Sequence, residues 1–191
     1  GSTSAGDQPF YDIVVYGDSS GAVTAAAAAK RHGRSVILVN PTHFLGGMSA
    51  SGLGATDFGK RSTIGGIASE FYDAIAAAYG KKYVRSFEPH VGRHVFDKLI
   101  ADAGVPVVFN EQLNRETGVR RDGQRIVAIT MLSGKTYRGK MFIDATYVGH
   151  PLFESPLPPP RSPEKPPIDA PVIELRPGSR AREVRRQGPI L

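Results

Sequence analysis

The sequence predicts an α/β fold in which helices cover a largely parallel sheet, and three observations lead to this prediction. Between Tyr11 and Asn40 an apolar run, a glycine- and serine-containing turn, an alanine-rich segment and a second apolar run follow one another. Short alternating runs fill residues 113–138, and Met141 to Ala145 form one more apolar run. Strands that alternate with helices are typical of a parallel sheet, and the alternating runs predict an antiparallel insertion.

The opening segment is predicted to form a strand, a helix and a second strand. Ile13 to Val15 are continuously apolar, which is typical of a strand that is covered on both faces. Residues 22–30 are mostly alanine, the strongest helix former. The helix would begin near Ser20 and end at Gly33, and the second strand would end at Asn40.

The turn between the first strand and the helix, GDSSGA at residues 17–22, has the character of a phosphate site. Gly17 lets the chain leave the strand sharply, and the first N–H groups of the helix carry partial positive charge. The dinucleotide fingerprint is G-x-G-x-x-G with an acidic residue about 20 positions later. Ser19, Ala22 and Asn40 stand where that fingerprint has its second glycine, third glycine and acid. We therefore predict a pyrophosphate site, and a ligand-free βαβ unit is the alternative.

The middle of the chain is predicted to contain two further helices and a meander. Helical spacing covers residues 63–79 and 94–103, and residues 105–109 form an apolar run that is typical of a strand. Two turn sequences, at 121–124 and 133–134, separate alternating runs. The expected three-stranded antiparallel meander comprises residues 113–120, 125–132 and 136–138.

Composition narrows the class of protein. The chain has 191 residues, a net charge of +6 and no cysteine, so it has room for one domain with extensions and cannot form disulfides. No apolar run approaches the ~18 residues that span a membrane, and no basic recognition element indicates nucleic-acid binding. We predict no metal site, no membrane insertion and no nucleic-acid partner. We expect a soluble protein, either cytoplasmic or exported after removal of a signal peptide.

The two ends of the chain differ in composition from residues 10–150, which we expect to form the folded domain. Residues 1–9 are small and polar, which predicts a disordered lead-in. Residues 151–191 hold eleven of the fifteen prolines and many arginines. Proline at this density interrupts helices and sheets, so this segment is expected to be a disordered tail. Capture of a protein partner through its proline motifs is the alternative.

Five motifs follow the first turn in a fixed order, and together they cover about residues 10–150. The chain resembles the FAD-dependent oxidoreductases of the glutathione-reductase-like Rossmann type, specifically a subgroup that carries these motifs. After YGDSSGAV at 16–23 they are LGGM at 45–48, GLGATDFG at 52–59, IGGIASEFY at 64–72, FEPHV at 87–91 and FIDATYVG at 142–149.

The resemblance implies a Rossmann-like FAD/NAD(P)-binding fold with FAD as cofactor. The first turn would line the pyrophosphate, Asn40 would replace the family's ribose-binding Glu, and Leu113 would offer its backbone to the adenine. The glycines before Met48 would allow the cofactor to approach closely. The implied cofactor contacts are Gly17, Ser19, Ser20, Gly21, Ala22, Asn40, Gly46, Gly47, Met48, Leu113, Asp144, Ala145 and Thr146.

The resemblance ends after Gly149, where family members continue into a substrate domain, so the chain is expected to be a truncated member. The first hypothesis is an FAD-binding oxidoreductase domain of unknown substrate; whether it is an active enzyme stays open. An inactive nucleotide-binding remnant and an interaction module that acts through the tail are the alternatives. Asp57 and His90 are further candidates for substrate contact, but the stronger explanation is structural: an Asp after Thr in a glycine-rich loop usually bonds the local backbone, and a His beside Pro89 caps or packs.

Overall fold

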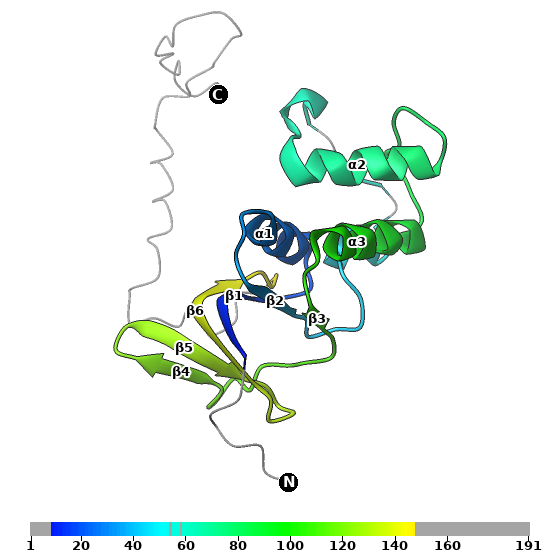
Figure 1. Cartoon of the computed structure of the whole chain (residues 1–191). Coiled ribbons are helices and arrows are strands. Elements are labelled where there is room, and N and C mark those ends of the chain that lie inside the picture. Colours follow the sequence, from blue (N-terminus) through cyan, green and yellow to red (C-terminus); the bar gives the residue numbers. More distant parts are fainter. Residues whose placement is uncertain (1–8, 54, 58, 148–191) are drawn as a thin grey trace, which may run out of the picture. The chain divides into compact units, whose positions relative to one another are not determined.

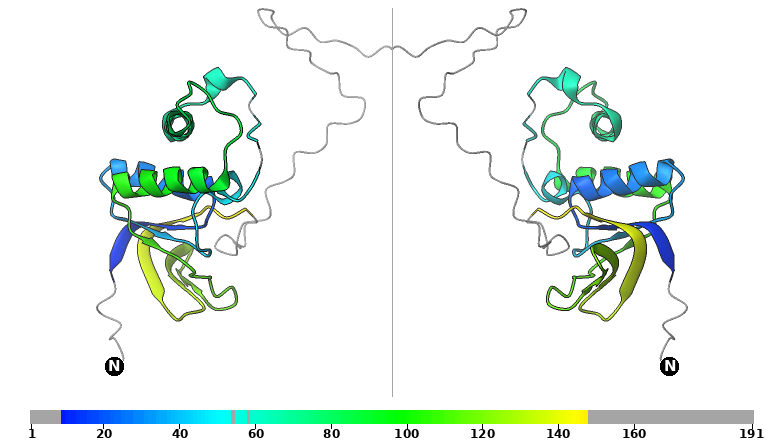
Figure 2. Two further views of the ribbon diagram at one scale, coloured as in Figure 1. Left: turned by 90° about the vertical axis from the view of Figure 1, so that its right-hand side faces the viewer. Right: turned by 90° about the vertical axis from the view of Figure 1, so that its left-hand side faces the viewer.

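Six strands form one mixed sheet in the order β3-β2-β1-β6-β5-β4. The computed structural model describes residues 9–53, 55–57 and 59–147. Helices α1 and α3 lie along one face of the sheet, and α2 lies beyond them, on the side away from the sheet (Figures 1 and 2). The strands are β1 (Phe10–Tyr16), β2 (Val36–Val39), β3 (Val107–Val108), β4 (Val119–Asp122), β5 (Arg125–Thr130) and β6 (Thr136–Asp144).

The helices are α1 (Ser20–Arg31), α2 (Gly66–Ala78) and α3 (Pro89–Ala103), with short 3-10 turns η1 (Gly47–Ala50) and η2 (Arg61–Thr63). Helix α1 begins where the sequence predicts, and Gly33 follows its end with a φ of 74°. Helix α3 starts five residues earlier than predicted, because Pro89 occupies a first-turn position, where its missing N–H costs nothing. The predicted lead-in, apart from Pro9, and the predicted tail lie outside the described residues.

Strand β1 lies at the centre of the parallel part of the sheet and pairs in parallel with both β2 and β6. Val15 and Leu38 face the helices, in the same apolar cluster as the residues of α1 and α3. Val14 and Val39 face the opposite side, where the meander covers them. The strand is therefore covered on both faces, as its continuous apolar run predicts. This arrangement confirms the predicted α/β fold with an antiparallel meander.

The meander corrects the prediction in two places. The runs 136–138 and 141–145, predicted as separate strands, fall in one strand, β6, which ends at Asp144, one residue earlier than predicted. This strand pairs antiparallel with β5 at its start and parallel with β1 along its later part. Gly139 does not break this strand; it allows the close approach of β1, since a Cβ there would lie 2.9 Å from a methyl group of Val14. The predicted strand 113–120 is ordered as β4 only from Val119, because a turn at Asn114 precedes it.

Within the part of the chain that the structure describes, no helix has both the length and the apolar character to cross a membrane. Across the same residues, His, Asp and Glu side chains form no group of three that could hold a metal ion.

A polar network joins β1 to β6 and to the segment before β2. Asp12 accepts hydrogen bonds from Lys140 Nζ (2.7 Å) and from Ser35 through its N–H (3.0 Å) and hydroxyl (2.9 Å). The bond from Lys140, followed by the two from Ser35, holds the pKa of Asp12 well below its ordinary value of 3.8. A carboxylate with a lowered folded-state pKa stabilises the fold above its unfolded pKa and loses this contribution as the pH falls.

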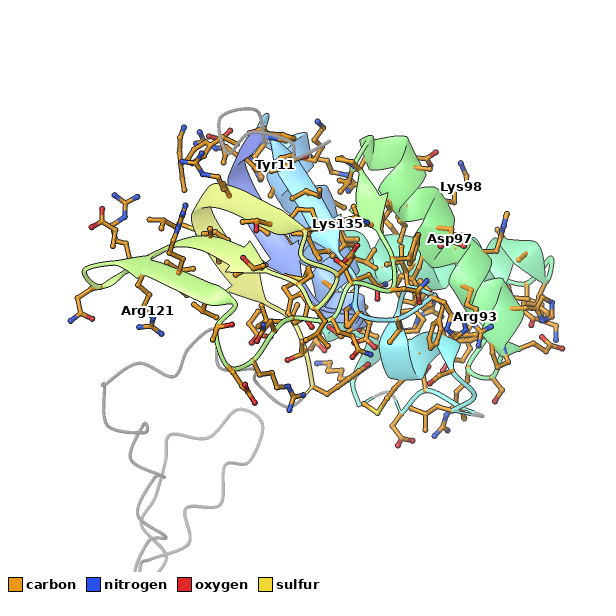
Figure 3. All side chains as sticks on the ribbon, turned by 90° about the horizontal axis from the view of Figure 1, so that it is seen from below. Tyr11, Arg93, Asp97, Lys98, Arg121 and Lys135 are labelled. Carbon is orange, nitrogen blue, oxygen red and sulfur yellow. The ribbon has the colours of Figure 1, made fainter. Side chains whose placement is uncertain are left out.

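We therefore expect the replacement Lys140→Met to flatten the dependence of unfolding free energy on pH below about pH 5. Wild-type protein should lose stability as the pH falls through 3.8 and below, because the unfolded Asp12 takes up its proton first. Urea unfolding at a series of pH values measures this slope. Lys98→Met is the control, since Lys98 (Figure 3), far from Asp12 in the sequence, forms its ion pair with Asp102 of the same helix. Equal slopes for wild type and Lys140→Met would contradict the assignment.

Candidate functional site

Three segments that are distant in sequence meet at the carboxyl ends of β1, β2 and β6. The Ala145 N–H donates to the carbonyl of Tyr16 (2.8 Å), and the Ser19 hydroxyl donates to the carbonyl of Ala145 (2.6 Å). The Gly46 N–H donates to the carbonyl of Asp18 (3.0 Å). The structure thus brings together the first turn, the loop after β2 and the end of β6. In open α/β sheets this edge is where ligands bind.

Gly17 makes the first turn compatible with the end of β6. Its φ is 145°, and a Cβ at this position would lie 2.4 Å from the carbonyl oxygen of Ala145. A side chain there would need strained backbone and would collide with main-chain atoms rather than with a movable side chain. The glycine is therefore required by the packing of the turn against β6.

Ser19, in the position of the second fingerprint glycine, is the N-cap of α1. Its hydroxyl accepts from the Ala22 N–H (3.3 Å) and donates to Ala145. These bonds direct the hydroxyl toward the body of the protein, so a serine is accommodated where the fingerprint has glycine. The side chain is 9% exposed and joins the helix to β6.

The amino terminus of α1 fits an anionic group. The first turn of this 12-residue helix has no acidic residue, and apart from the chain neighbours of Gly21 and the backbone of its helix, only the Ser19 hydroxyl (3.2 Å) among the described residues lies within 4 Å of the place of a Cβ on Gly21. The first N–H groups of an α-helix have no intrahelical acceptor, and the helix dipole adds partial positive charge at that end. Donor groups and charge therefore suit a pyrophosphate, which supports the roles predicted for Ser20 and Gly21.

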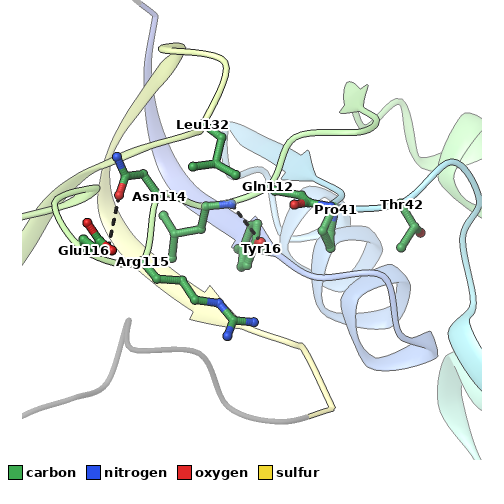
Figure 4. A pocket seen from close by; sticks show the side chains of 9 residues that line it. Tyr16, Pro41, Thr42, Gln112, Asn114, Arg115, Glu116 and Leu132 are labelled. Atoms are coloured by element: carbon green, nitrogen blue, oxygen red, sulfur yellow. Dashed lines mark hydrogen bonds between the residues drawn. The ribbon is translucent and has the colours of Figure 1, made fainter.

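A cavity of about 570 Å³ lies at the end of β1, just before the first turn (Figure 4). Tyr16, at the end of β1, belongs to its wall, and the loop after β2, the segment before β4 and the hairpin between β5 and β6 complete the lining. Its volume falls within the roughly 300–1,000 Å³ of small-molecule sites. The lining residues are Tyr16, Pro41, Thr42, Gln112, Leu113, Asn114, Arg115, Glu116 and Leu132.

Leu113, predicted to contact the adenine, lines the cavity, and its N–H donates to the Tyr16 hydroxyl (3.1 Å; Figure 4). The neighbouring residues Gln112 and Asn114 bond to Leu132 and Thr130. Leu113 thus lies opposite Met131 in an antiparallel bridge, between two residues that bond to the partner segment. Its own N–H therefore points away from that segment, toward Tyr16. Burial raises the pKa of Tyr16 above its ordinary value of 10.0, so this phenol stays neutral at physiological pH.

The segment that carries Leu113 is fixed at its start by Glu111, a carboxylate that is only 3% exposed. Burial raises its pKa, but hydrogen bonds from Lys135 Nζ (2.5 Å) and the Ser133 hydroxyl (2.5 Å) outweigh burial and leave the pKa lowered. The Glu111 N–H also donates to the carbonyl of Asn40 (3.0 Å). Glu111 and Lys135 (Figure 3) thus join the cavity wall to the hairpin between β5 and β6.

Asn40 is fully buried and organises the loop that follows it. Its side-chain oxygen accepts from the Thr42 N–H (2.7 Å) and hydroxyl (3.0 Å), and its amide nitrogen donates to the carbonyl of Phe44 (2.9 Å). Asn40 is not part of the cavity wall, whereas Thr42 is. Its ribose contact stays a prediction. The sequence analysis did not select Thr42 or Tyr16 as site residues. Each carries a hydroxyl at or just beyond the end of a buried strand, and this pattern could have indicated them as candidates.

The two glycines before Met48 face the protein's own rings, and their close approach to the cofactor stays a prediction. Gly46 and Gly47 have φ values of 97° and 50°. A Cβ on Gly46 would lie 2.2 Å from the ring of Phe96, and one on Gly47 would lie 2.2 Å from the Tyr147 hydroxyl. Arg93 of α3 secures the same loop by donating from Nε to the carbonyl of Ala50 (2.9 Å; Figure 3).

The remaining predicted residues fall into two groups. Asp144 closes the turn at the end of β6 by accepting from the Thr146 N–H (3.0 Å) and hydroxyl (2.8 Å), close to the first turn. Asp57 is fully exposed and pairs with Arg85 (3.2 Å), and His90 is exposed in the first turn of α3. Neither Asp57 nor His90 contributes to the cavity wall.

A phosphate-suited turn and an adjoining cavity at the carboxyl edge of a parallel sheet define a dinucleotide-binding domain of the Rossmann type. The sequence profile of the FAD dependent oxidoreductase family matches residues 12–155. The chain belongs to the FAD dependent oxidoreductase family, which confirms the predicted family and assigns FAD as its cofactor.

Solved flavoprotein structures share this fold. A flavin-containing monooxygenase from Stenotrophomonas maltophilia is 18% identical with a TM-score of 0.50, over 72% of this chain and 38% of that one. Bacillithiol disulfide reductase from Staphylococcus aureus is 14% identical with a TM-score of 0.51, over 73% and 39%. A myxobacterial FAD-dependent halogenase, chondrochloren halogenase, is 15% identical with a TM-score of 0.53, over 73% and 38%. At these identities the likeness shows the fold.

One curated relative matches a short stretch of the chain. Over 40 residues the chain is 52% identical to 4-oxocyclohexanecarboxylate 2-dehydrogenase of Sinomonas cyclohexanicum, a match that covers 21% of this chain and 7% of that protein. The chain therefore spans well under half the length of the flavoproteins that it resembles.

Proposed function

We propose that residues 10–150 form the FAD-binding domain of an oxidoreductase, with the pyrophosphate at the first turn and the adenosine in the cavity beside it. The observation that carries this proposal is that Tyr16 belongs to both parts of the site, because it adjoins the first turn and also lines the cavity. It ends β1 immediately before Gly17, and its hydroxyl holds Leu113 in the cavity wall. Bound FAD supplies hydride and electron transfer through its isoalloxazine ring.

At the pyrophosphate end, the chain's own contribution is binding and orientation. Helix α1 presents its first N–H groups, and Ser19 fixes the start of the helix against Ala145. Because the hydroxyl of Ser19 is held by protein partners, the turn keeps its shape without rearrangement when an anion binds. Preformed donors of this kind avoid the cost of ordering the site during binding.

At the adenosine end, the cavity wall offers groups of the right kinds. Leu132 and the Leu113 side chain provide apolar surface for a base, and Gln112 supplies amide donors and acceptors. Thr42, at the start of the loop after β2, is proposed to stand nearest the ribose in place of the acid that the fingerprint requires. Arg115 adds a positive charge to the same wall.

Ser20→Glu tests the pyrophosphate site. A carboxylate at the first position of α1 should lower FAD affinity at least tenfold, about 1.4 kcal/mol, because it repels the diphosphate. Fold stability should not fall, since an acid at a helix amino terminus contributes about 0.3–1 kcal/mol favourably. FAD affinity is measured from the change in flavin fluorescence on titration, and stability is measured by thermal unfolding.

Ser20→Gln is the matched control, because glutamine has the shape of glutamate without its charge. It should retain FAD affinity within about threefold, which is well below the tenfold that 1.4 kcal/mol represents. Equal affinities of the Glu and Gln variants would reject the pyrophosphate assignment. Wild-type protein that fails to bind FAD at all would reject the proposed function.

A further inference from the structure

One residue outside the cavity wall, Glu111, bonds to the chain beside three of the segments that line the cavity. It directly precedes Gln112 of the wall, and its N–H donates to the carbonyl of Asn40 (3.0 Å), at the start of the loop after β2. Its carboxylate accepts from the Ser133 hydroxyl (2.5 Å), and Ser133 directly follows Leu132 of the wall. The three segments are therefore joined at one buried residue.

The tip of the hairpin between β5 and β6, residues 132–135, has little packing of its own. Leu132 is 66% exposed, although it lines the cavity (Figure 4). Ser133, Gly134 and Lys135 are exposed as well, and Gly134 has a φ of 85°. A turn with a glycine and few buried contacts opens locally at little cost. A backbone bond from Leu132 to the segment before β4 (2.7 Å) holds its base, and the bonds from Ser133 and Lys135 to Glu111 hold the rest.

We propose that Glu111 is a positioning residue for the adenosine half of FAD and that it acts by fixing Leu132 against the cavity. The inference rests on the proposed function, which places the adenosine there. Leu132 offers apolar surface to a base only while the hairpin tip lies against the segment before β4. The bond from Lys135 Nζ to Glu111 (2.5 Å) joins opposite charges, and such bonds are roughly twice as strong as neutral ones. Loss of this bond should let the tip move and displace the surface on which the base packs.

Lys135→Met tests this role from the exposed side of the pair, because the Lys135 side chain is 61% exposed and its loss leaves no cavity in the core. The variant should bind ADP about threefold to tenfold more weakly than wild type, the effect of one lost hydrogen bond. Inorganic pyrophosphate, which lacks the adenosine, should bind within about twofold of wild type. An ion pair with only a structural role would lower stability without separating the two ligands. Both affinities are measured by calorimetric titration of the full chain.

Lys140→Met is the matched control at neutral pH. Lys140 also donates to a carboxylate, that of Asp12 (2.7 Å), and its side chain is 64% exposed, but neither residue lines the cavity. This variant should bind ADP and pyrophosphate as wild type does. Lys135→Arg restores a positively charged donor and should recover ADP affinity to within about twofold of wild type.

Ser133→Ala removes the second bond to Glu111 from another exposed residue, and it should separate ADP from pyrophosphate in the same direction as Lys135→Met. Unchanged ADP affinity in both variants, or an equal loss for both ligands, would overturn the role of Glu111 alone. Wild-type protein that binds neither FAD nor ADP would overturn the proposed function as well.

Discussion

Gly17→Ala should destabilise the fold by about 2–5 kcal/mol and abolish FAD binding, the largest effect that we expect from a single methyl group in this chain. The added Cβ would lie 2.4 Å from the oxygen and 2.5 Å from the carbon of the Ala145 carbonyl. Neither atom belongs to a flexible side chain, so β6 and the turn must move apart. That movement breaks the Ser19 bond to Ala145 and misplaces the amino terminus of α1.

Gly33→Ala separates backbone strain from collision. Gly33 also has a positive φ, 74°, but nothing among the described residues lies within 4 Å of the place of its Cβ. We expect a loss of only about 1 kcal/mol there, because a left-handed backbone is the sole cost. Urea unfolding of both variants measures the difference. Similar losses of stability at the two sites would show that Gly17 is needed only for its positive φ and that a collision with Ala145 adds no cost.

Phe96→Ala should cost about 3–5 kcal/mol of stability, the range for removing a buried phenylalanine. Its ring is 2% exposed and stacks on Phe71 of α2 at a centroid distance of 4.2 Å. The same ring fills the open side of Gly46, where a Cβ would lie 2.2 Å from it. Loss of the ring therefore leaves a cavity between α2 and α3 and also removes the wall that holds the loop after β2.

Phe109→Ala is the matched control, because Phe109 is 39% exposed and lies outside the cavity wall. We expect a loss of about 1 kcal/mol or less there. Stability is measured by urea unfolding, and FAD affinity is measured at a temperature where both variants stay folded. A Phe96→Ala variant that is destabilised but binds FAD with wild-type affinity would show that the loop after β2 does not need the Phe96 ring to keep its shape.

The first βαβ unit was predicted closely because its signals are local. A continuous apolar run, a glycine at the strand end, a capping serine and an alanine-rich stretch each favour one local structure within a few residues. The meander was predicted less well, since Gly139 looks like an interruption in the sequence. Its role depends on Val14, more than a hundred residues away, whose methyl group occupies the space beside it.

The candidate site shows the same division. The residues of the first turn could be selected from the sequence, and the structure places them together with Ala145, although their contacts with the cofactor stay predictions. Asn40 occupies the position of a ligand-binding acid but is fully buried and bonded to Thr42 and Phe44. From the sequence Tyr16 is predicted only as a strand residue, yet its hydroxyl accepts a hydrogen bond from the Leu113 N–H in the cavity wall. The neighbouring sequence shows neither which groups bond to Asn40 nor which group meets the hydroxyl of Tyr16.

By itself the sequence determined the class of fold, the family and the turn at which we propose that the pyrophosphate binds, because short-range backbone preferences and a run of motifs in order carry that information. Only the tertiary structure decided which rings face Gly46 and Gly47, which hydroxyl meets Leu113 and where the cavity opens. Those features arise where three strand ends converge, and the atoms that meet there are set by packing across the sheet rather than by neighbours along the chain.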